Sequence, residues 1–195
     1  MFRLKLPTDP RWANIAENNL QEILSDHAWC EQKAATNAIH LIIQNSEKPE
    51  LVTEMLKISI EEMEHFKMVH DIILERGYEF LRERKDDYVG ELAKYMKKSS
   101  TGERESGLIE RLLFAAMIEA RSCERFKVLA ETIKDEKLAK FYWELMESEA
   151  GHYATFINFA RKYAETIDVE SRWNAWLEEE ARIIKSFGTG ETIHG

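Results

Sequence analysis

Two four-residue segments of this chain, Glu-Met-Glu-His at 62–65 and Glu-Ala-Gly-His at 149–152, place a carboxylate and an imidazole three residues apart. On an α-helix this spacing puts both side chains on one face, about 60° apart around the axis, so that both can reach one metal ion. In a chain with 36 acidic residues either segment alone is weak evidence, because most such pairs lie on the solvated surface. The neighbouring residues therefore decide how the two segments are interpreted.

Both segments lie within helical rows of apolar residues. Steps of three and four residues lead from the first pair to Met55, Ile58, Val69 and Ile72, and from the second to Leu138, Tyr142, Leu145, Phe156 and Phe159. This periodicity is typical of the buried face of a helix, so an acid and an imidazole interrupt an apolar core at both places. Buried charges are costly unless they are compensated, and one metal ion compensates several carboxylates at once.

Capping and breaking residues predict the first two long helices. A cap residue followed by Pro10 opens the first helix, which runs to about Gln44 and is compatible with a break near residues 18–19. Pro49 opens the second helix, which ends near Gly77. The charged residues 78–102 that follow predict a long crossover connection, with a short helix around residues 88–97.

The second half of the chain predicts three more helices. Ser100 and Glu103 fit a capping box that opens a third long helix. Asp135 caps a fourth, and Asp168 starts a fifth with one apolar face. Residues 188–195 are rich in glycine, so we expect an irregular tail there.

The helices form a repeat with one further acid in each pair. Glu31 lies on the apolar row of the first helix and Glu119 on that of the third. Glu31 precedes Glu62 by 31 residues and Glu119 precedes Glu149 by 30, so in an antiparallel hairpin each acid lies level with its partner. Two hairpins joined by a long crossover predict an all-α, ferritin-like four-helix bundle with an extra C-terminal helix, forming a single domain over residues 1–195.

The predicted metal ligands are four carboxylates and two imidazoles: Glu31, Glu62, His65, Glu119, Glu149 and His152. Each of two ions would take one histidine and one acid of the first or third helix, with Glu62 and Glu149 bridging ions held roughly 3.5–4 Å apart. Four negative charges neutralise two divalent cations, and a donor set without thiolate suits iron or manganese rather than structural zinc. The alternative is a set of hydrogen-bonded polar residues inside an ordinary bundle.

Five residues near these positions have other interpretations. His27 is either a core histidine or a partner of a ligand, and Ser122 is either a core serine or a residue that faces the site. Glu124 lies off the apolar row, as a surface residue or a group behind the ligands would. Cys30 and Cys123 form no CxxC motif, and we expect both to be small buried apolar residues.

The net charge of −9 argues against a general nucleic-acid-binding surface but leaves room for a local basic patch. Residues 1–11 and 82–104 each contain more basic than acidic residues, and the candidates for phosphate contacts there are Arg3, Lys5, Arg84, Lys85, Lys94, Lys97 and Lys98. The chain has no apolar run near 18 residues, and its N-terminus lacks a signal-peptide pattern. We therefore expect no membrane span and a cytoplasmic protein.

The ligand set alone leaves the activity open, because hydroxylases, peroxide reductases and iron-storage proteins share it. A ferritin-like or rubrerythrin-like iron oxidase or peroxide reductase is one alternative, although the lack of a CxxC pair disfavours a self-contained rubrerythrin. A helical interaction module without enzyme activity is another.

Longer runs of sequence add a family resemblance. They are Thr-Asp-Pro-Arg-Trp at 8–12, Asp-His-Ala-Trp-Cys-Glu-Gln-Lys-Ala-Ala at 26–35 and Ile-Glu-Ala-Arg-Ser-Cys-Glu-Arg-Phe at 118–126, and residues 148–152 and 193–195 continue the pattern. Together they resemble the MiaE family of tRNA hydroxylases over nearly the whole chain. The run at 118–126 is more specific than either Glu-x-x-His segment.

The resemblance implies a non-haem di-iron monooxygenase that hydroxylates the isopentenyl group of methylthio-isopentenyl-adenosine beside the tRNA anticodon, using dioxygen and two electrons. It assigns the ligand roles to the six residues named above, with two iron ions preferred over manganese. It also implies a ferredoxin-type electron donor and, as substrate, a tRNA that carries a prenylated adenosine. We expect a monomer or a dimer.

Overall fold

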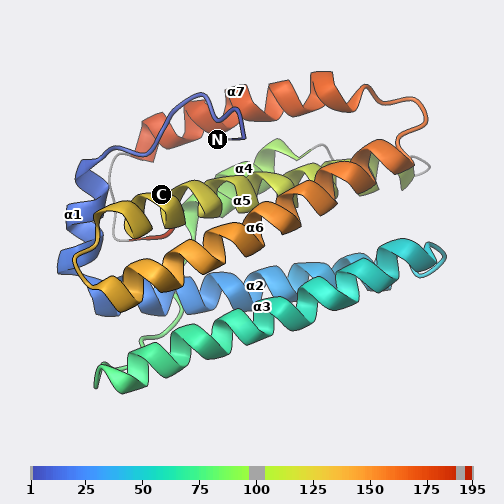
Figure 1. Ribbon diagram of the computed structural model, residues 1–195. Helices are drawn as coiled ribbons and strands as arrows, with labels where there is room; N and C mark the ends of the chain where they lie inside the picture. The colour runs from blue at the N-terminus through green and yellow to red at the C-terminus, as the bar shows by residue number, and fades with distance from the viewer. Residues whose placement is uncertain (1, 97–103, 188–191, 195) are drawn as a thin grey trace. The chain divides into compact units, whose positions relative to one another are not determined.

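The structure, a computed structural model, describes residues 2–96, 104–187 and 192–194. Every regular element in this part of the chain is an α-helix, which confirms the all-α prediction (Figure 1). The helices are α1 (Arg11–Asn18), α2 (Leu20–Gln44), α3 (Pro49–Glu75), α4 (Asp87–Tyr95), α5 (Arg104–Thr132), α6 (Glu136–Tyr163) and α7 (Val169–Phe187).

The described residues divide into two compact units. The α2–α3 unit contains Ala16–Lys85 together with Thr192 and Ile193. The α4–α7 unit contains residues 2–15, 86–96, 104–187 and His194. Each unit has one pair of long helices, and the single domain expected over residues 1–195 stays a prediction.

In the α2–α3 unit the two helices lie side by side (Figure 1). Their buried faces include Ala28, Ala35, Ala38 and Leu41 on α2 and Leu51, Met55, Ile58 and Val69 on α3. The three alanines of α2 allow the larger side chains of α3 to pack closely, as the apolar rows of the sequence predict. In the turn, the side-chain amide of Asn45 donates to the carbonyl of Leu41 at 2.9 Å.

The ends of this unit follow the sequence signals. The break between α1 and α2 falls at Asn19, and α3 is followed by Gly77, whose φ of +68° suits glycine. The next segment packs against α2. The indole N–H of Trp29 donates to the carbonyl of Leu81 at 2.9 Å, and the backbone N–H of Leu81 donates to Oγ of Ser25 at 3.2 Å.

In the α4–α7 unit α5 and α6 lie side by side, and α7 packs along α5 (Figure 1). Asp86 caps α4 and Asp135 caps α6, each accepting from the backbone N–H three residues later, at 2.9 and 3.1 Å. Arg172 on α7 donates to both carboxylate oxygens of Glu110 on α5, at 2.5 and 2.7 Å. The predicted cap at Asp135 and the extra C-terminal helix are therefore confirmed.

Replacing Asp135 with alanine tests the first turn of α6. Loss of an N-cap acceptor leaves a backbone N–H without its partner, and we expect the free energy of unfolding to fall by about 1 kcal/mol. The exposed Lys137, two residues further on, provides the control Lys137→Ala. Urea unfolding of both variants measures the difference, and equal losses would show that the cap does not stabilise α6.

The crossover and the tail differ in part from expectation. The proposed capping box of Ser100 and Glu103 lies outside the described residues. The short helix begins at Asp87 and ends at Tyr95, two residues earlier than expected, where Met96 leaves the helical conformation. Ile193 and His194 are non-helical, as an irregular tail predicts, but both are almost fully buried.

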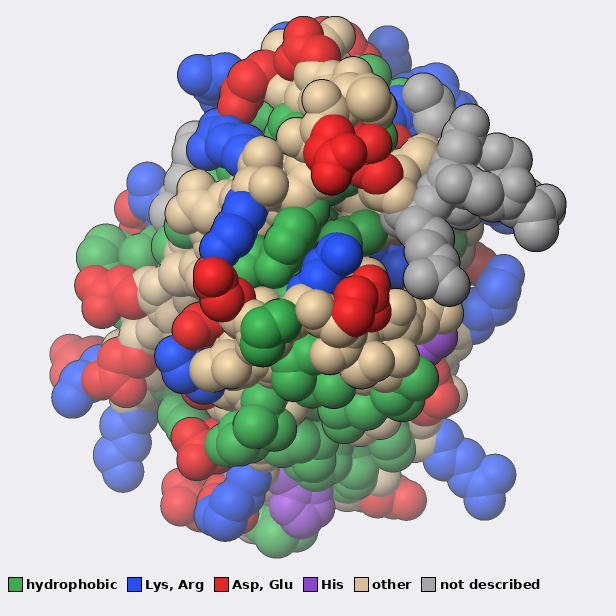
Figure 2. Space-filling model, turned by 90° about the vertical axis from the view of Figure 1, so that its right-hand side faces the viewer, with side chains coloured by type: hydrophobic (Ala, Val, Ile, Leu, Met, Phe, Trp, Pro, Cys, Tyr) green, Lys and Arg blue, Asp and Glu red, His purple; other side chains and the backbone are tan. Residues whose placement is uncertain are grey.

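The outer surface of the α2–α3 unit carries several exposed apolar residues. Ile39, Ile43, Leu56, Ile60 and Met63 are each at least 45% exposed. Figure 2 shows hydrophobic side chains gathered in the lower half of its view. These residues do not amount to a membrane-spanning element, since no helix in the described part of the chain is both long and apolar enough to cross a membrane.

Candidate metal centre

Three of the predicted ligands lie together in the α2–α3 unit, and we call them the first half-site: Glu31 on α2 and Glu62 and His65 on α3. Their ligand atoms lie within 4.8 Å of one another. Nδ1 of His65 is 3.5 Å from Oε2 of Glu62 and 3.8 Å from Oε2 of Glu31. All three side chains are buried, Glu62 completely.

The other three predicted ligands form the second half-site in the α4–α7 unit: Glu119 on α5 and Glu149 and His152 on α6. Their ligand atoms also lie within 4.8 Å of one another. Nδ1 of His152 is 3.3 Å from Oε2 of Glu149, and all three side chains are no more than 5% exposed. Each hairpin therefore presents two carboxylates and one imidazole at one level of its interior.

Helix geometry explains why the same trio recurs. The Glu-x-x-His spacing sets acid and imidazole on one face, and the antiparallel partner helix brings the third carboxylate level with them. Ligands bonded to a transition metal at about 2.0–2.2 Å lie roughly 3–3.5 Å from one another. The distances of 3.3 and 3.5 Å between imidazole and carboxylate in the two half-sites fit that requirement.

His27 orients one of these carboxylates. It is fully buried on α2, and its Nε2 lies 2.5 Å from Oε1 of Glu31, whose other oxygen faces His65. An ionised carboxylate only accepts hydrogen bonds, so Nε2 of His27 would be the donor when Glu31 serves as an ionised metal ligand. A hydrogen bond of this kind fixes the direction of a ligand carboxylate, which favours the interpretation of His27 as a ligand's partner.

The two cysteines differ. Burial, followed by the nearby Glu149 carboxylate, raises the pKa of the Cys123 thiol to about 12, and the thiol donates to the carbonyl of Met146 at 3.1 Å. Cys123 is thus a neutral buried residue, as predicted. Cys30 is only half-buried, contrary to expectation. Its position lies about 100° around α2 from the inward-facing Glu31, which explains the difference.

Glu124 is neither a surface residue nor a group behind a ligand, because it belongs to a buried ion cluster around Arg121. Glu124 accepts from the backbone N–H of Thr8 at 2.7 Å and from Arg121 at 2.7 Å. The guanidinium also donates to Glu180 on α7 at 2.8 Å and to the carbonyl of Leu6 at 3.0 Å. Both Arg121 and Glu180 are fully buried.

The sequence did not lead us to predict this cluster, although the pattern of α7 contains a sign of it. Glu180 lies on the apolar row of α7, one turn from Trp176, Leu177, Ile183 and Ile184. An acid on such a row needs a cation, and Arg121 on α5 supplies it. Burial raises the pKa of Glu180 above its usual value, and the guanidinium of Arg121 offsets part of that rise.

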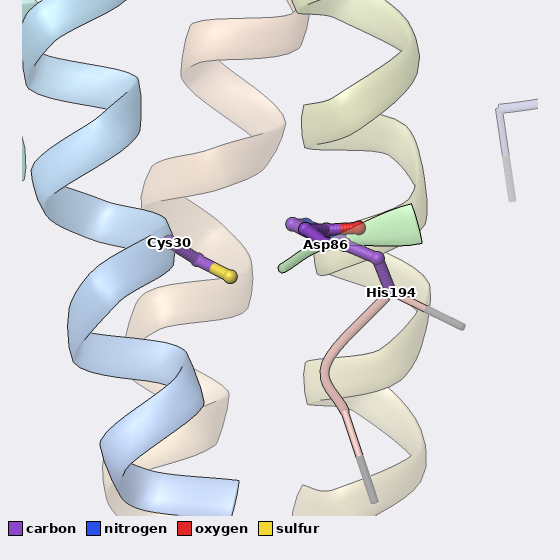
Figure 3. Close-up of side chains that lie close together, drawn as sticks. All are labelled: Cys30, Asp86 and His194. Carbon is purple, nitrogen blue, oxygen red and sulfur yellow. The ribbon is translucent and has the colours of Figure 1, made fainter. Parts of the chain in front are cut away.

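His194 is a second buried group that the sequence analysis did not single out as a functional residue. Its Nδ1 lies 2.9 Å from Oδ2 of Asp86, and Figure 3 shows the two side chains pointing toward one another. Its Nε2 lies 3.0 Å from Oγ of Ser122 on α5. The ring of Tyr88 stacks on the imidazole at a centroid distance of 5.6 Å.

The described members of the predicted basic set are all exposed: Arg3, Lys5, Arg84, Lys85 and Lys94. Lys5 forms an ion pair with Glu178, and Lys94 pairs with Glu91. Lys97 and Lys98 lie outside the described residues. Arg84 and Lys85 are adjacent in the chain and stay candidates for phosphate contacts.

The chain is similar to proteins of one known family. A family model described as tRNA-(MS[2]IO[6]A)-hydroxylase (MiaE) matches residues 2–195. The chain is 32% identical over 166 residues to the tRNA 2-(methylsulfanyl)-N(6)-isopentenyladenosine(37) hydroxylase of Pseudomonas putida, covering 85% of this chain and 78% of that protein. A protein of the same name from Salmonella typhimurium is 29% identical, with 94% and 84% covered.

Among solved structures, the chain resembles Protein 43 with aldehyde deformylating oxygenase activity from Synechococcus. The two share 28% sequence identity and a TM-score of 0.90, and the match covers 98% of this chain and 95% of that one. The likeness confirms the predicted ferritin-like fold class.

Proposed function

Because this chain belongs to the MiaE family of tRNA hydroxylases, we propose that it hydroxylates 2-(methylsulfanyl)-N6-isopentenyladenosine in tRNA. One oxygen atom of dioxygen enters a C–H bond of the isopentenyl group, and the other leaves as water with two electrons and two protons. The observation that carries the proposal is the recurrence of a buried trio of two carboxylates and an imidazole in both hairpins. A helical interaction module has no need of six such groups in its interior.

The proposed cofactor is a pair of iron ions, and its proposed ligands are the six residues predicted from the sequence: Glu31, Glu62, His65, Glu119, Glu149 and His152. The donor set fits, because it contains only carboxylate oxygen and imidazole nitrogen, and four carboxylates balance the charge of two divalent ions. When bound, such a pair supplies the reductive activation of dioxygen that hydroxylation of a C–H bond requires. Manganese would fit the same donors and is the less favoured choice.

The residues of the chain hold and shield this centre. Burial of all six ligands excludes water, which strengthens every electrostatic interaction among them. His27 fixes the direction of Glu31, and the helical spacing fixes each histidine relative to the acid three residues before it. Within each half-site these contacts support the proposed ligand roles.

A direct assay tests the function. Full-length protein loaded with ferrous iron is incubated with a chemical reductant, dioxygen and tRNA carrying the methylsulfanyl-isopentenyl nucleoside, and the nucleosides are then weighed by mass spectrometry. We expect a gain of one oxygen atom that depends on iron and is absent with tRNA carrying unmodified adenosine. Failure to gain that mass with fully loaded protein would refute the proposal.

Replacing His27 with glutamine tests the support of Glu31. We expect the affinity for iron to fall by about 10–100-fold, as is usual when a partner behind a metal ligand is lost. Competition with a coloured chelator measures it. His40→Gln makes the same chemical change at a half-buried position of the same helix and is the matched control. Equal affinities of the two variants would show that His27 is an ordinary core histidine.

The tRNA would bind in part through the adjacent Arg84 and Lys85. Reversing both charges, Arg84→Glu with Lys85→Glu, is expected to raise KM for tRNA and leave kcat unchanged. The dependence of log affinity on log salt concentration should become shallower by about one per lost phosphate contact. Lys57→Glu with Lys140→Glu changes the net charge equally at exposed positions elsewhere. If both double variants behave alike, the two residues do not contact the tRNA backbone.

A second candidate function comes from the solved structure of the Synechococcus protein, whose name records aldehyde deformylating oxygenase activity. Incubating the same iron-loaded protein with a linear aliphatic aldehyde and following release of the formyl carbon tests it. Rapid turnover of ferrous iron or peroxide without tRNA would instead favour a ferritin-like oxidase or a rubrerythrin-like peroxide reductase.

The remaining partners follow from the proposed reaction. The two electrons would come from a ferredoxin-type donor protein, and the enzyme would work in the cytoplasm, where tRNA is modified. A monomer or a dimer, rather than a large hollow assembly, suits an enzyme that must admit an anticodon loop. Light scattering of the purified protein distinguishes these states.

A further inference from the structure

Three polar groups of the α4–α7 unit form a continuous hydrogen-bonded row. Oδ2 of Asp86 lies 2.9 Å from Nδ1 of His194, and Nε2 of His194 lies 3.0 Å from Oγ of Ser122. Asp86 stands at the start of α4, His194 in the C-terminal segment and Ser122 on α5. The row is therefore assembled from three separate parts of the chain.

The row leads from a partly exposed group to a buried one. The side chain of Asp86 is 12% exposed and that of His194 is 3% exposed, and Ser122 is 7% exposed. Ser122 follows the proposed ligand Glu119 by three residues, so both lie on one face of α5 about one turn apart. The row thus ends beside the second half-site.

The chemistry of the three groups suits proton transfer. Asp86, as a carboxylate, accepts from the Nδ1–H of His194 and stabilises the ring when it is doubly protonated. Ser122 both donates and accepts, so it can take a proton from Nε2 and release its own. The ring of Tyr88 stacks on the imidazole, and the guanidinium of Arg125 donates to the backbone carbonyl of His194 at 3.4 Å.

We infer that Asp86, His194 and Ser122 deliver a proton to the metal centre, an inference that rests on the proposed hydroxylase function. The reaction consumes two protons as one oxygen atom leaves as water, and a closed site must receive them through the protein. Protonated His194 gives its Nε2 proton to Ser122, and Ser122 releases its hydroxyl proton toward the site. The neutral imidazole, held by Asp86, regains a proton from solvent between turnovers.

The burial of Ser122 distinguishes this row from a hydrolytic Ser-His-Asp triad, which has the same residue types. A serine nucleophile must meet a substrate, and Ser122 is buried beneath the imidazole it contacts. The hydroxyl instead lies one helical turn from a carboxylate that the proposed iron centre needs. Delivery of a proton therefore fits the placement better than attack on an acyl group.

The first measurement uses metal-free protein and so does not depend on activity. In protein labelled with ¹⁵N-histidine, we expect His194 to carry its proton on Nδ1 when neutral, in a slowly exchanging bond that Asp86→Asn weakens. A rapidly exchanging imidazole like that of a surface histidine would overturn the inference, because no row would then exist in solution.

The second measurement uses iron-loaded His194→Gln in the tRNA assay. Glutamine can accept from Ser122 and donate to Asp86, so it preserves the packing of the tail but cannot pass a proton on. We expect kcat to fall by roughly 100-fold, the lower end for positioned proton transfer, with KM for tRNA unchanged and a changed solvent deuterium isotope effect on kcat. Ser122→Ala should show the same changes, and His40→Gln is the matched control.

The outcomes separate the two proposals. An active natural protein with an equally active His194→Gln variant overturns the relay and leaves the hydroxylase function standing. A variant with a lower unfolding temperature and an unchanged isotope effect shows that His194 only anchors the tail, which also overturns the relay. A natural protein that hydroxylates no tRNA removes the function and the relay with it.

Discussion

Replacing Glu149 with glutamine is expected to release most of the bound iron and to lower tRNA hydroxylation by more than about 100-fold. Loss of a hydrogen-bonding partner of a metal ligand typically costs about 10–100-fold, and loss of a ligand itself should cost more. Glutamine keeps the volume of the side chain and removes its charge, which leaves the proposed centre with one positive charge too many. Metal analysis of the purified variant and the nucleoside assay measure the two effects. Glu147→Gln, on an exposed face of the same helix, is the matched control.

The same substitution is expected to change thermal stability in opposite directions in metal-free and in iron-loaded protein. In metal-free protein, Glu149→Gln should raise the thermal unfolding midpoint, because a buried carboxylate is costly to desolvate and the amide is not charged. In iron-loaded protein it should lower the midpoint, since the natural protein gains stability from the bound metal. A variant that lowers both midpoints alike would show that Glu149 has an ordinary structural role.

Replacing Arg121 with methionine is expected to reduce the free energy of unfolding by about 3–5 kcal/mol. The guanidinium is fully buried against Glu180, and its loss leaves that carboxylate in the interior without its cation. Small domains are stable by only about 5–15 kcal/mol, so such a loss is a large share of the total. Urea unfolding of the metal-free protein isolates this effect from metal binding.

Two further variants check the cause. Arg121→Met combined with Glu180→Leu should recover part of the loss, because the double variant removes both buried charges, and it supplies a measurement if the single variant fails to fold. Arg182→Met deletes an arginine whose pairing with Glu179 lies on the surface, and we expect little change. A loss for Arg121→Met no larger than for Arg182→Met would contradict the assigned role of the cluster.

The parts of the structure that sequence predicts well are those set by local spacing. Helix periodicity alone places Glu62 with His65 and Glu149 with His152, since three residues of helix fix their geometry. Equal distances from the turns then place Glu31 and Glu119 level with them. Caps such as Asp135 are equally local, because their acceptor lies three residues from its donor.

The parts that sequence misses depend on contacts between distant residues. Arg121 and Glu180 are 59 positions apart, and His194 and Asp86 are 108 apart. Periodicity shows that a position is buried but does not identify what it meets. Glu124 illustrates the limit: it lies off the apolar row of α5, yet Thr8 and Arg121 enclose it.

The segment before α1 enters the interior through this cluster, which affects how its basic residues should be studied. The carbonyl of Leu6 and the hydroxyl of Thr8 both receive hydrogen bonds from Arg121, two residues after Glu119 on the same helix. Deleting the first eight residues would therefore disturb α5 beside a proposed iron ligand, and activity lost on shortening would say nothing about tRNA. The roles of Arg3 and Lys5 are better separated by point substitution, which leaves these two acceptors in place.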